Sequence, residues 1–409
     1  MLAVCQKWRY VGLPIVYRQL FVSSDPFDTQ ETKITSNIGL CASQGYQRWA
    51  KSLKIRLATV SLDKMLKHTG QLLAAAGASQ WPSIVSLQLG MAPQYALAME
   101  DEGAGALGPQ VCEELAAWFA ELLPGISRLL TRMCEGDAAC AQFVEQLQRQ
   151  VVQQLVHVDG GFDAAGSCQL SGLQTLSASF GAAYYSARGF INAGSLRHLR
   201  LYDTLPATLW TSFYSKSSSP FVSFDNLATL SLSPCSSFDC FDEFGELDKL
   251  PANANVFQKL QFPGLQCLKL GVGAHERGLV AGAQFPGRLA KLHVHSADGA
   301  ELVAFNVRFG LAERQQLAQC MGAAEHGDFG PLASFMLGAG LRPSYSSLTV
   351  YYDVELPSMR AWPRLSRLRI LGQVTADQAW QLAASLNVSR QQNTLVECND
   401  RQTTICAKS

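Results

Sequence analysis

Residues 262–270 read Phe-Pro-Gly-Leu-Gln-Cys-Leu-Lys-Leu, and the spacing of the three leucines decides the fold. Leu265, Leu268 and Leu270 form the pattern Leu-x-x-Leu-x-Leu. The last two lie two residues apart, so they point to one face of a strand, and the first reaches the same core from the incoming turn. The proline ahead of this strand favours an extended conformation for the aromatic residue before it.

The same six-residue pattern recurs along the chain and predicts a series of similar strands. Clear copies begin at Ile84, Leu196, Leu227, Leu289 and Leu365, and weaker copies at Ala50, Leu173 and Tyr345. One such strand cannot bury its apolar face alone, but copies that stack in parallel bury a continuous core. We therefore expect a repeat architecture with a parallel sheet.

The copies are unevenly spaced. The 89-residue interval between the copies at Ile84 and Leu173 must hide a degenerate copy, for which residues 151–158 are the expected strand. Helical periodicity falls between the strands, with Ser61 as the expected N-cap of the first helix. The predicted helices span residues 62–75, 111–123, 141–155 and 376–386.

This alternation of strand and helix predicts an α/β fold, and the short intervals between copies match leucine-rich-repeat lengths. The chain therefore resembles an irregular leucine-rich-repeat solenoid, a horseshoe with parallel strands on its concave face and helices on its convex face. A doubly wound α/β domain is the alternative. It is disfavoured because Gly271-Val272-Gly273 lacks the third glycine of a dinucleotide-binding loop.

Composition narrows the classes of partner. The chain has 409 residues and a formal net charge of zero, which gives no reason to expect nucleic acid or a membrane as a partner. No apolar run reaches the ~18 residues of a membrane-spanning helix, and no secretory signal is recognisable. Twelve cysteines include no Cys-x-x-Cys pair, so reduced thiols are expected. These features predict a cytoplasmic or nuclear protein.

The first 22 residues resemble a known module. An apolar helical face is followed by a proline and an aromatic-basic pair, and the residues that carry the match are Val4, Cys5, Trp8, Leu13, Pro14, Tyr17 and Arg18. They resemble the second half of an F-box, a family that often continues into leucine-rich repeats in fungal proteins. The resemblance implies that residues 1–22 are a partial F-box-like helix and that residues 23–409 are the solenoid.

By this resemblance the chain is a substrate receptor of a cullin-type ubiquitin ligase, held by the Skp adaptor through the F-box positions. The family's first two helices normally precede this segment, so the F-box is read as N-terminally truncated. Adaptor binding is then expected if the module is complete upstream. The alternatives are an N-terminal cap for the solenoid and a stand-alone leucine-rich-repeat scaffold with no ubiquitin role.

The positions between the leucines predict a basic concave face. Positions three and five of eight copies give sixteen residues, of which six are Lys or Arg, two are His and none is Asp or Glu. The basic members are Lys54, His198, Arg200, Lys269, Lys291, His293, Arg367 and Arg369. We interpret them as a site for an acidic protein partner. The alternative is that their stems cover apolar surface and keep the strands soluble.

No sequence signature of catalysis is present, so binding rather than chemistry is expected. His293 and His295 share one strand face, but zinc needs one or two further ligands and nearby Asp298 alone is a weak case. No metal site or cofactor is therefore predicted. Residues 238–250 alternate phenylalanine with Asp and Glu, which fits a helix on the convex side or an acidic plug for the concave face.

Overall fold

A computed structural model of the 409-residue chain forms two compact units, residues 1–192 and 193–409. The residues that it describes are 12, 15–24, 34–57, 61–76, 80–91, 108–132, 138–160, 170–179, 191–202, 210, 212–216, 219–233, 255–295, 301–326, 328, 330–339, 346–351, 365–371, 394–399 and 402–407. The boundary predicted at residue 22 falls inside the first strand, Gln19–Ser24.

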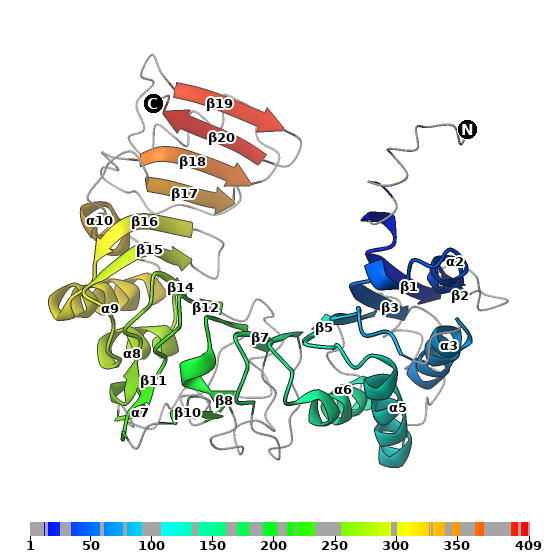
Figure 1. The fold of residues 1–409 in the computed structure, drawn as a ribbon. Coiled ribbons are helices and arrows are strands. Elements are labelled where there is room, and N and C mark those ends of the chain that lie inside the picture. The colour runs from blue at the N-terminus through cyan, green and yellow to red at the C-terminus, as the bar shows by residue number, and fades with distance from the viewer. Residues whose placement is uncertain are drawn as a thin grey trace. The chain divides into compact units, whose positions relative to one another are not determined.

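Unit 1 is built around a mostly parallel sheet with the strand order β2-β1-β3-β4-β5-β6-β7 (Figure 1). The edge strand β2 is antiparallel to β1, and the other pairs are parallel. The elements in chain order are β1 (Gln19–Ser24), β2 (Ile34–Ser36), α2 (Ile38–Ser43), a 3-10 turn (Gln47–Trp49), β3 (Ser52–Leu57), α3 (Leu62–Ala75), β4 (Ser86–Met91), α5 (Pro109–Leu122), β5 (Arg128–Arg132), α6 (Ala138–Val151), β6 (His157–Gly160), β7 (Thr175–Ser179) and β8 (Ile191–Asn192).

Unit 2 contains a second run of parallel strands, β9-β12-β14-β15, which continues through β16, β17, β18, β20 and β19. β16 is antiparallel to both of its neighbours, and β20 is antiparallel to β18 and β19. The elements are a 3-10 turn (Ala193–Ser195), β9 (His198–Tyr202), β10 (Phe213–Tyr214), β11 (Val222–Ser223), β12 (Thr229–Ser233), α7 (Asn255–Gln258), β13 (Leu260–Gln261), β14 (Cys267–Gly271), α8 (Ala274–Gly282), β15 (Arg288–His295), β16 (Glu301–Arg308), α9 (Leu311–Glu325), α10 (Gly330–Ala339), β17 (Ser346–Tyr351), β18 (Leu365–Leu371), β19 (Thr394–Asn399) and β20 (Gln402–Ala407).

The leucines of the repeated pattern form the core of each unit. Their fourth positions lie in register on adjacent strands, and each is at most 1% exposed. Burying one leucine contributes about 2 kcal/mol, so these columns dominate the stability of the sheet. The columns are Leu20, Leu53, Leu87, Leu129, Val158 and Leu176 in unit 1, and Leu199, Leu230, Leu268 and Leu292 in unit 2.

A recurring hydrogen bond fixes this register. The carbonyl at position two of one copy accepts hydrogen bonds from two successive backbone N–H groups of the next copy. The carbonyl of Arg18 accepts from Lys51 and Ser52 at 2.8 and 3.1 Å, and that of Lys51 accepts from Val85 and Ser86 at 2.9 and 3.1 Å. The remaining acceptors of this kind are Val85, Ser127 and Val156 in unit 1, and Arg197 and Ala228 in unit 2.

The turn before each strand also stacks on its predecessor. The N–H of Leu265 donates to the carbonyl of Phe262 at 3.3 Å, which closes the Phe-Pro-Gly-Leu turn. A Cβ on Gly264 would lie 2.9 Å from the carbonyl oxygen of Asp225 in the preceding turn. In unit 1, a Cβ on Gly125 would lie 2.4 Å from the carbonyl oxygen of Pro82. Glycine therefore allows successive turns to approach closely.

Aromatic residues of these turns, among them Phe262 and Trp81, are buried. Phe262 stacks on its counterparts in the turns on either side, with ring centroids 4.9 Å from Phe224 and 5.1 Å from Phe285. In unit 1, Trp81 is 1% exposed, and its indole N–H donates to the carbonyl of Leu73 at the end of α3 at 3.1 Å. The aromatic side chains thus join the strand turns to the helices.

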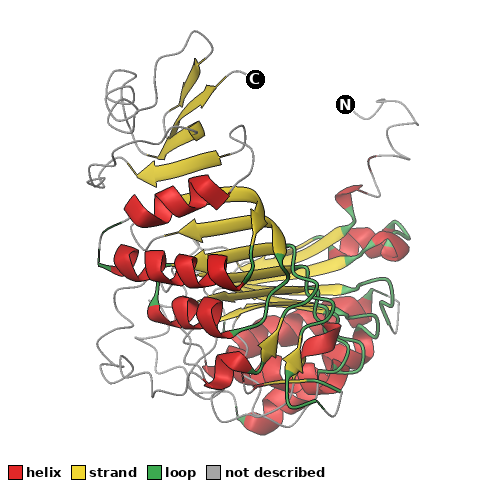
Figure 2. Ribbon diagram, turned by 90° about the vertical axis from the view of Figure 1, so that its left-hand side faces the viewer, coloured by secondary structure: helices red, strands yellow, loops and turns green. Residues whose placement is uncertain are grey.

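The described helices of each unit lie along one side of its strands (Figure 2). Unit 1 packs α3 on α5 by seating the Trp118 ring on Gly70, where a Cβ would lie 2.4 Å from the ring. In unit 2, Arg277 of α8 reaches Glu325 of α9 at 3.1 Å, and Gly322 leaves room for its guanidinium. Burial alternates along β3, with Leu53, Ile55 and Leu57 buried. One sheet face is therefore open, unlike the two covered faces of a doubly wound domain.

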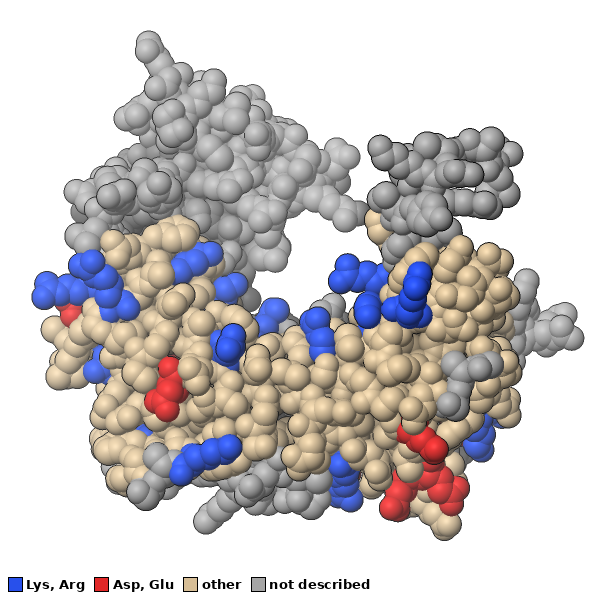
Figure 3. All heavy atoms as spheres, viewed as in Figure 1, with Lys and Arg blue, Asp and Glu red and all other residues tan. Residues whose placement is uncertain are grey.

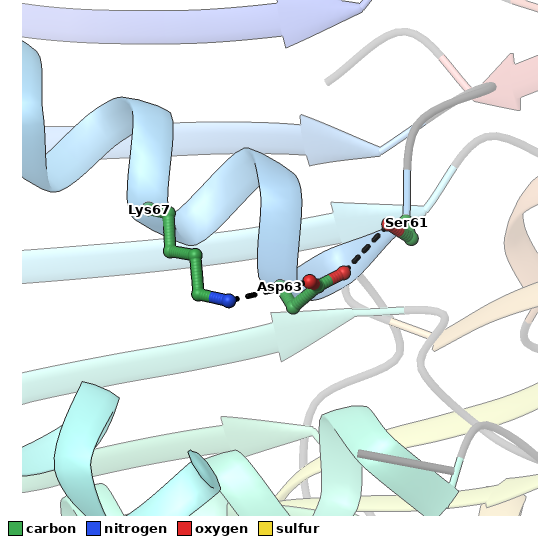
Figure 4. Close-up of polar contacts among 3 residues, drawn as sticks. All are labelled: Ser61, Asp63 and Lys67. Atoms are coloured by element: carbon green, nitrogen blue, oxygen red, sulfur yellow. Dashed lines mark hydrogen bonds and ion pairs between the residues drawn. The ribbon is translucent and has the colours of Figure 1, made fainter. Parts of the chain in front are cut away.

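The predicted helices at 62–75, 111–123 and 141–155 are confirmed as α3, α5 and α6, with ends that shift by up to four residues. The one at 376–386 lies outside the described residues, as does the segment 238–250. Ser61 precedes α3, but its hydroxyl makes no backbone cap. It donates instead to Asp63 Oδ1 at 2.6 Å, and Asp63 pairs with Lys67 at 3.6 Å (Figure 4).

The hidden strand expected at 151–158 was misplaced. Residues up to Val151 belong to α6, and the strand is β6, which begins six residues later and ends two residues later than expected. A second hidden strand, β5, was missed altogether. Their copies are Ile126-x-x-Leu129-x-Thr131 and Leu155-x-x-Val158-x-Gly160, and neither ends in a leucine. The residues that replace the final leucine in these two copies, Thr131 and Gly160, pack against each other.

We predict that Gly160→Ala strongly destabilises the protein. Gly160 has φ of 127°, which L side chains rarely adopt, and an added Cβ would lie 2.0 Å from the carbonyl oxygen of Thr131. The expected loss is about 2 kcal/mol or more in urea unfolding. Gly90→Ala in β4 is the control, because nothing lies within 4 Å of its added Cβ. Equal midpoints for the two variants would contradict this account of the β5–β6 contact.

Candidate functional site

The open face of each sheet, defined as the side presented by positions three and five of the copies, carries the candidate site. In unit 2 the strand register aligns these positions into two rows across five strands. Row three is His198, Thr229, Cys267, Lys291 and Phe305, and row five is Arg200, Ser231, Lys269, His293 and Val303. None of these ten residues is Asp or Glu, so the rows have a formal charge of plus three from Arg200, Lys269 and Lys291.

The basic side chains of these rows differ in their exposure. Arg200 is exposed, Lys269 and Lys291 are half-buried, and His293 is 6% exposed. Burial raises the pKa of the Cys267 thiol, and the charges of Lys269 and Lys291 act on it in the opposite direction. Figure 3 shows blue Lys and Arg side chains on the surface of unit 2, where red Asp and Glu side chains are also visible in that view.

Unit 1 has a weaker version of this face. Its rows contain Lys54 and Arg128, both exposed. Phe21, 42% exposed, lies in register with Lys54. The strands that the sequence interpretation missed or misplaced add Asp159, which lies in register with Leu130 and Ser177. Asp159 therefore adds an acidic residue to the rows of unit 1, whereas rows three and five of unit 2 contain none.

Backbone register extends row five of unit 2 beyond β16. Val303 pairs with Ser347 of β17, and Ser347 pairs with Arg367 of β18. Arg369 pairs with Thr349 in the next row. Both predicted arginines therefore belong to the same sheet as Lys269, at positions separated from it by the antiparallel β16.

Most of the F-box-like positions, namely Val4, Cys5, Trp8, Leu13 and Pro14, lie outside the described residues. Tyr17 is described and is 7% exposed, with its ring centroid 5.1 Å from that of Tyr46. It occupies position one of the copy that forms β1, so it packs in the core of unit 1. Ile15 and Val16, by contrast, are 71% and 63% exposed.

A second candidate is a buried polar cluster at the start of α8, which sequence reasoning missed. The indole N–H of Trp210 donates to Nε2 of His275 at 3.1 Å, which leaves the imidazole proton on Nδ1. Burial lowers the pKa of His275 to about 4. Burial also raises the pKa of Glu276 to about 7, with a further contribution from nearby Glu325 and an opposing backbone hydrogen bond.

This cluster is structural rather than catalytic in character. His275 and Glu276 are 7% and 3% exposed, so a dissolved substrate does not reach them. A Cβ on Gly273 would lie 2.6 Å from Glu276 Oε2, so the glycine leaves space for the carboxylate at the helix start. Gly310 and Glu313 repeat this arrangement in α9, with a distance of 2.8 Å.

Other classes of site find no support in the described part of the chain. Those residues contain no group of three His, Cys, Asp or Glu side chains arranged to hold a metal ion. Cys41, Cys112, Cys267 and Cys320 form no disulfide. Within the same ranges, no helix has the length and apolar character needed to cross a membrane.

Comparison with known proteins adds no relative. No family model matches the sequence, and neither the curated proteins nor the solved structures contain a match.

We predict that Glu276→Gln stabilises the protein at alkaline pH. A carboxyl whose folded pKa is raised contributes stability that is complete below about pH 4.5 and is lost as the pH rises through about 7. Glutamine does not suffer this loss, so the variant should gain up to about 3 kcal/mol in urea unfolding at pH 8 and little at pH 4.5.

Glu313→Gln is the matched control for this pH dependence. Glu313 holds the same position in α9, but its side chain is 27% exposed and pairs with Arg308 at 3.3 Å. Its replacement should give no comparable gain at pH 8. An unchanged stability of Glu276→Gln at pH 8 would show that the buried carboxyl is accommodated without penalty.

Proposed function

We propose that the chain is a protein-interaction module that binds an acidic partner on the open face of unit 2. The observation that carries this proposal is the pair of aligned rows, in which Arg200, Lys269, Lys291 and the exposed His198 occur with no acidic residue, while His293 is buried beneath the surface. On a chain with zero net charge, such local segregation attracts negatively charged ligands to one place.

The strength of the attraction follows from the partial burial of the lysines. Charges in contact with a protein surface interact more strongly than in bulk water, and salt screens them over about 8 Å at physiological ionic strength. Lys269 and Lys291 are half-buried, so solvent screens their charges less than it screens the charges of fully exposed side chains. Binding should therefore weaken with added salt without disappearing.

The same proposal includes the finer description of the fold. We infer that each parallel run is part of an irregular leucine-rich-repeat-like solenoid. The repeated two-donor carbonyl, the stacked turns and the leucine columns support this description. Solenoids of this kind present strand surfaces to partners, because each copy contributes side chains at the same two positions.

Lys269→Glu combined with Lys291→Glu should reduce binding of a fluorescent glutamate peptide of about ten residues at least about tenfold. Reversing both charges replaces attraction with repulsion at adjacent strands. The measurement is fluorescence anisotropy of the peptide with the full chain at low salt, repeated at increasing salt.

The matched control is Lys216→Glu with Lys259→Glu, which changes the net charge equally at exposed positions outside the two rows. These substitutions should leave the affinity within about twofold. If both pairs weaken binding equally, the lysines of the rows serve solubility, and the proposed face does not bind the acidic ligand.

A second candidate function is that of an F-box-like substrate receptor of a cullin-type ubiquitin ligase. The specific observation in its favour is that Ile15 and Val16 expose apolar side chains within the F-box-like segment. Exposed adjacent apolar residues are a feature of docking sites. The burial of Tyr17 favours the alternative, in which this segment caps the core of unit 1.

Ile15→Asp with Val16→Asp should abolish retention of a Skp-type adaptor in co-purification, because two carboxylates would enter an apolar contact. Leu40→Asp is the control, since Leu40 is 56% exposed on α2 outside the segment. If neither this chain nor a version extended upstream retains the adaptor, the receptor proposal is wrong and the scaffold proposal remains.

A further inference from the structure

The antiparallel strand β16 changes the chemistry of the open face in unit 2. Register places Phe305 opposite Lys291 and Val303 opposite His293, so β16 adds apolar residues to rows that are otherwise polar. Leu302, Val303 and Ala304 are buried, at 5%, 8% and 1% exposed, so Phe305 is the β16 member of these rows that reaches solvent.

Phe305 is exposed at the end of the basic rows. Its side chain is 37% exposed, and the Lys291 ammonium lies 5.4 Å from its ring centroid. The neighbouring Asn306 has φ of 52° and is also exposed, which breaks the alternation of β16 at this point. A ligand that covers Phe305 would remove apolar surface from water and leave Lys291 beside its own charges.

We propose that the acidic partner carries a large apolar residue, aromatic or long aliphatic, which packs on Phe305 while its carboxylates face the basic rows. This inference rests on the proposed function and names the chemistry of its ligand. The partner segment would cross the strands of unit 2, with its apolar residue over β16 and its acidic residues over β14 and β9.

Strand spacing sets the sequence that such a segment requires. Adjacent strands lie about 4.8 Å apart, so two strand steps separate Arg200 from Lys269 in row five by about 10 Å. Phe305 lies two steps from Lys269 but in row three, two residues along the strand, so their backbones are about 12 Å apart, a difference that the long lysine side chain can span. An extended peptide covers about 10 Å in three residues. The expected motif therefore places an acidic residue three positions from the apolar residue and a second acidic residue three positions further, in either chain direction.

The composition of the rows favours a peptide over single-stranded nucleic acid. Nucleic-acid platforms stack successive bases on several aromatic side chains along a basic groove. The ten residues of the two rows include one phenylalanine and no tyrosine or tryptophan, and of their two histidines His293 is 6% exposed. The row neighbours of Phe305 on β12 and β14 are Thr229 and Cys267. A single ring fits one apolar side chain.

Unit 1 offers an internal comparison. Phe21 is 42% exposed and lies in register with Lys54, so it repeats the pairing of an aromatic residue with a lysine. Its row also contains Asp159, which opposes an acidic ligand. The inference therefore assigns the apolar contact to Phe305 of unit 2 and not to Phe21.

The test uses three labelled peptides of about ten residues and the full chain at low salt. The first has the spacing Phe-x-x-Glu-x-x-Glu within a Gly-Ser background, the second replaces Phe by Ser, and the third replaces both Glu by Gln. The first peptide should bind at least about fivefold more tightly than the second, the gain expected for one buried aromatic contact. The third should bind more weakly than the first.

Phe305→Ser should remove this preference and leave the affinity for the second peptide unchanged. Leu311→Ser is the matched control, because Leu311 is an apolar residue 60% exposed at the start of α9, outside the rows. Phe21→Ser should also preserve the preference. Circular dichroism of each variant verifies that the fold is retained.

The outcomes separate the two proposals. Failure of the wild-type chain to bind either glutamate peptide contradicts the proposed function and this inference with it. Equal binding of the first two peptides, or a preference that survives Phe305→Ser, overturns the inference alone. Tighter binding of a single-stranded oligonucleotide of about twelve residues, lost in Phe305→Ser, also overturns it and assigns the face to nucleic acid.

Discussion

One backbone contact organises the rest of the structure. The carbonyl at position two of a copy accepts hydrogen bonds from two N–H groups of the next copy. Because a carbonyl oxygen has two lone pairs, it satisfies both donors without a side chain. The bond fixes the register between neighbouring strands, and the register in turn places one leucine on the next in the core. The rows of the open face are aligned by the same constraint, so stability and the candidate binding surface share one origin.

The sequence predicted the elements in which local pattern and tertiary packing agree. The leucines of β14 and the helical periodicity of α3 each indicate their element without reference to a neighbour. β5 was not predicted and β6 was misplaced, because Thr131 and Gly160 stand where the pattern has its final leucine. These two residues pack against each other, and neither copy shows this contact when it is read alone. β16 was missed for a different reason, since an antiparallel strand carries no copy of the pattern.

The candidate site was predicted to a similar extent. Lys269, Lys291 and their basic neighbours were identified because the pattern defines which positions face outward. Phe305 was not identified, because its place beside Lys291 depends on the pairing of β16 with β15. The burial of Glu276 was equally hidden, since Glu325 approaches it from α9, far along the chain. Contacts between residues far apart in the sequence thus decide which polar side chains are buried and which lie beside an apolar neighbour.

The reversal of β16 has a consequence for cooperativity. Among the described residues of unit 2, the two-donor carbonyl links parallel neighbours, and an antiparallel strand pairs by a different geometry. β16 pairs with β17 over three residues and with β15 over seven, so in a chain of nearest-neighbour interactions the β16–β17 junction is the weaker of these two couplings. The strands β17 to β20 therefore form a segment whose local opening is expected to leave the β9–β15 run intact, so the basic rows can persist while the C-terminal strands fluctuate.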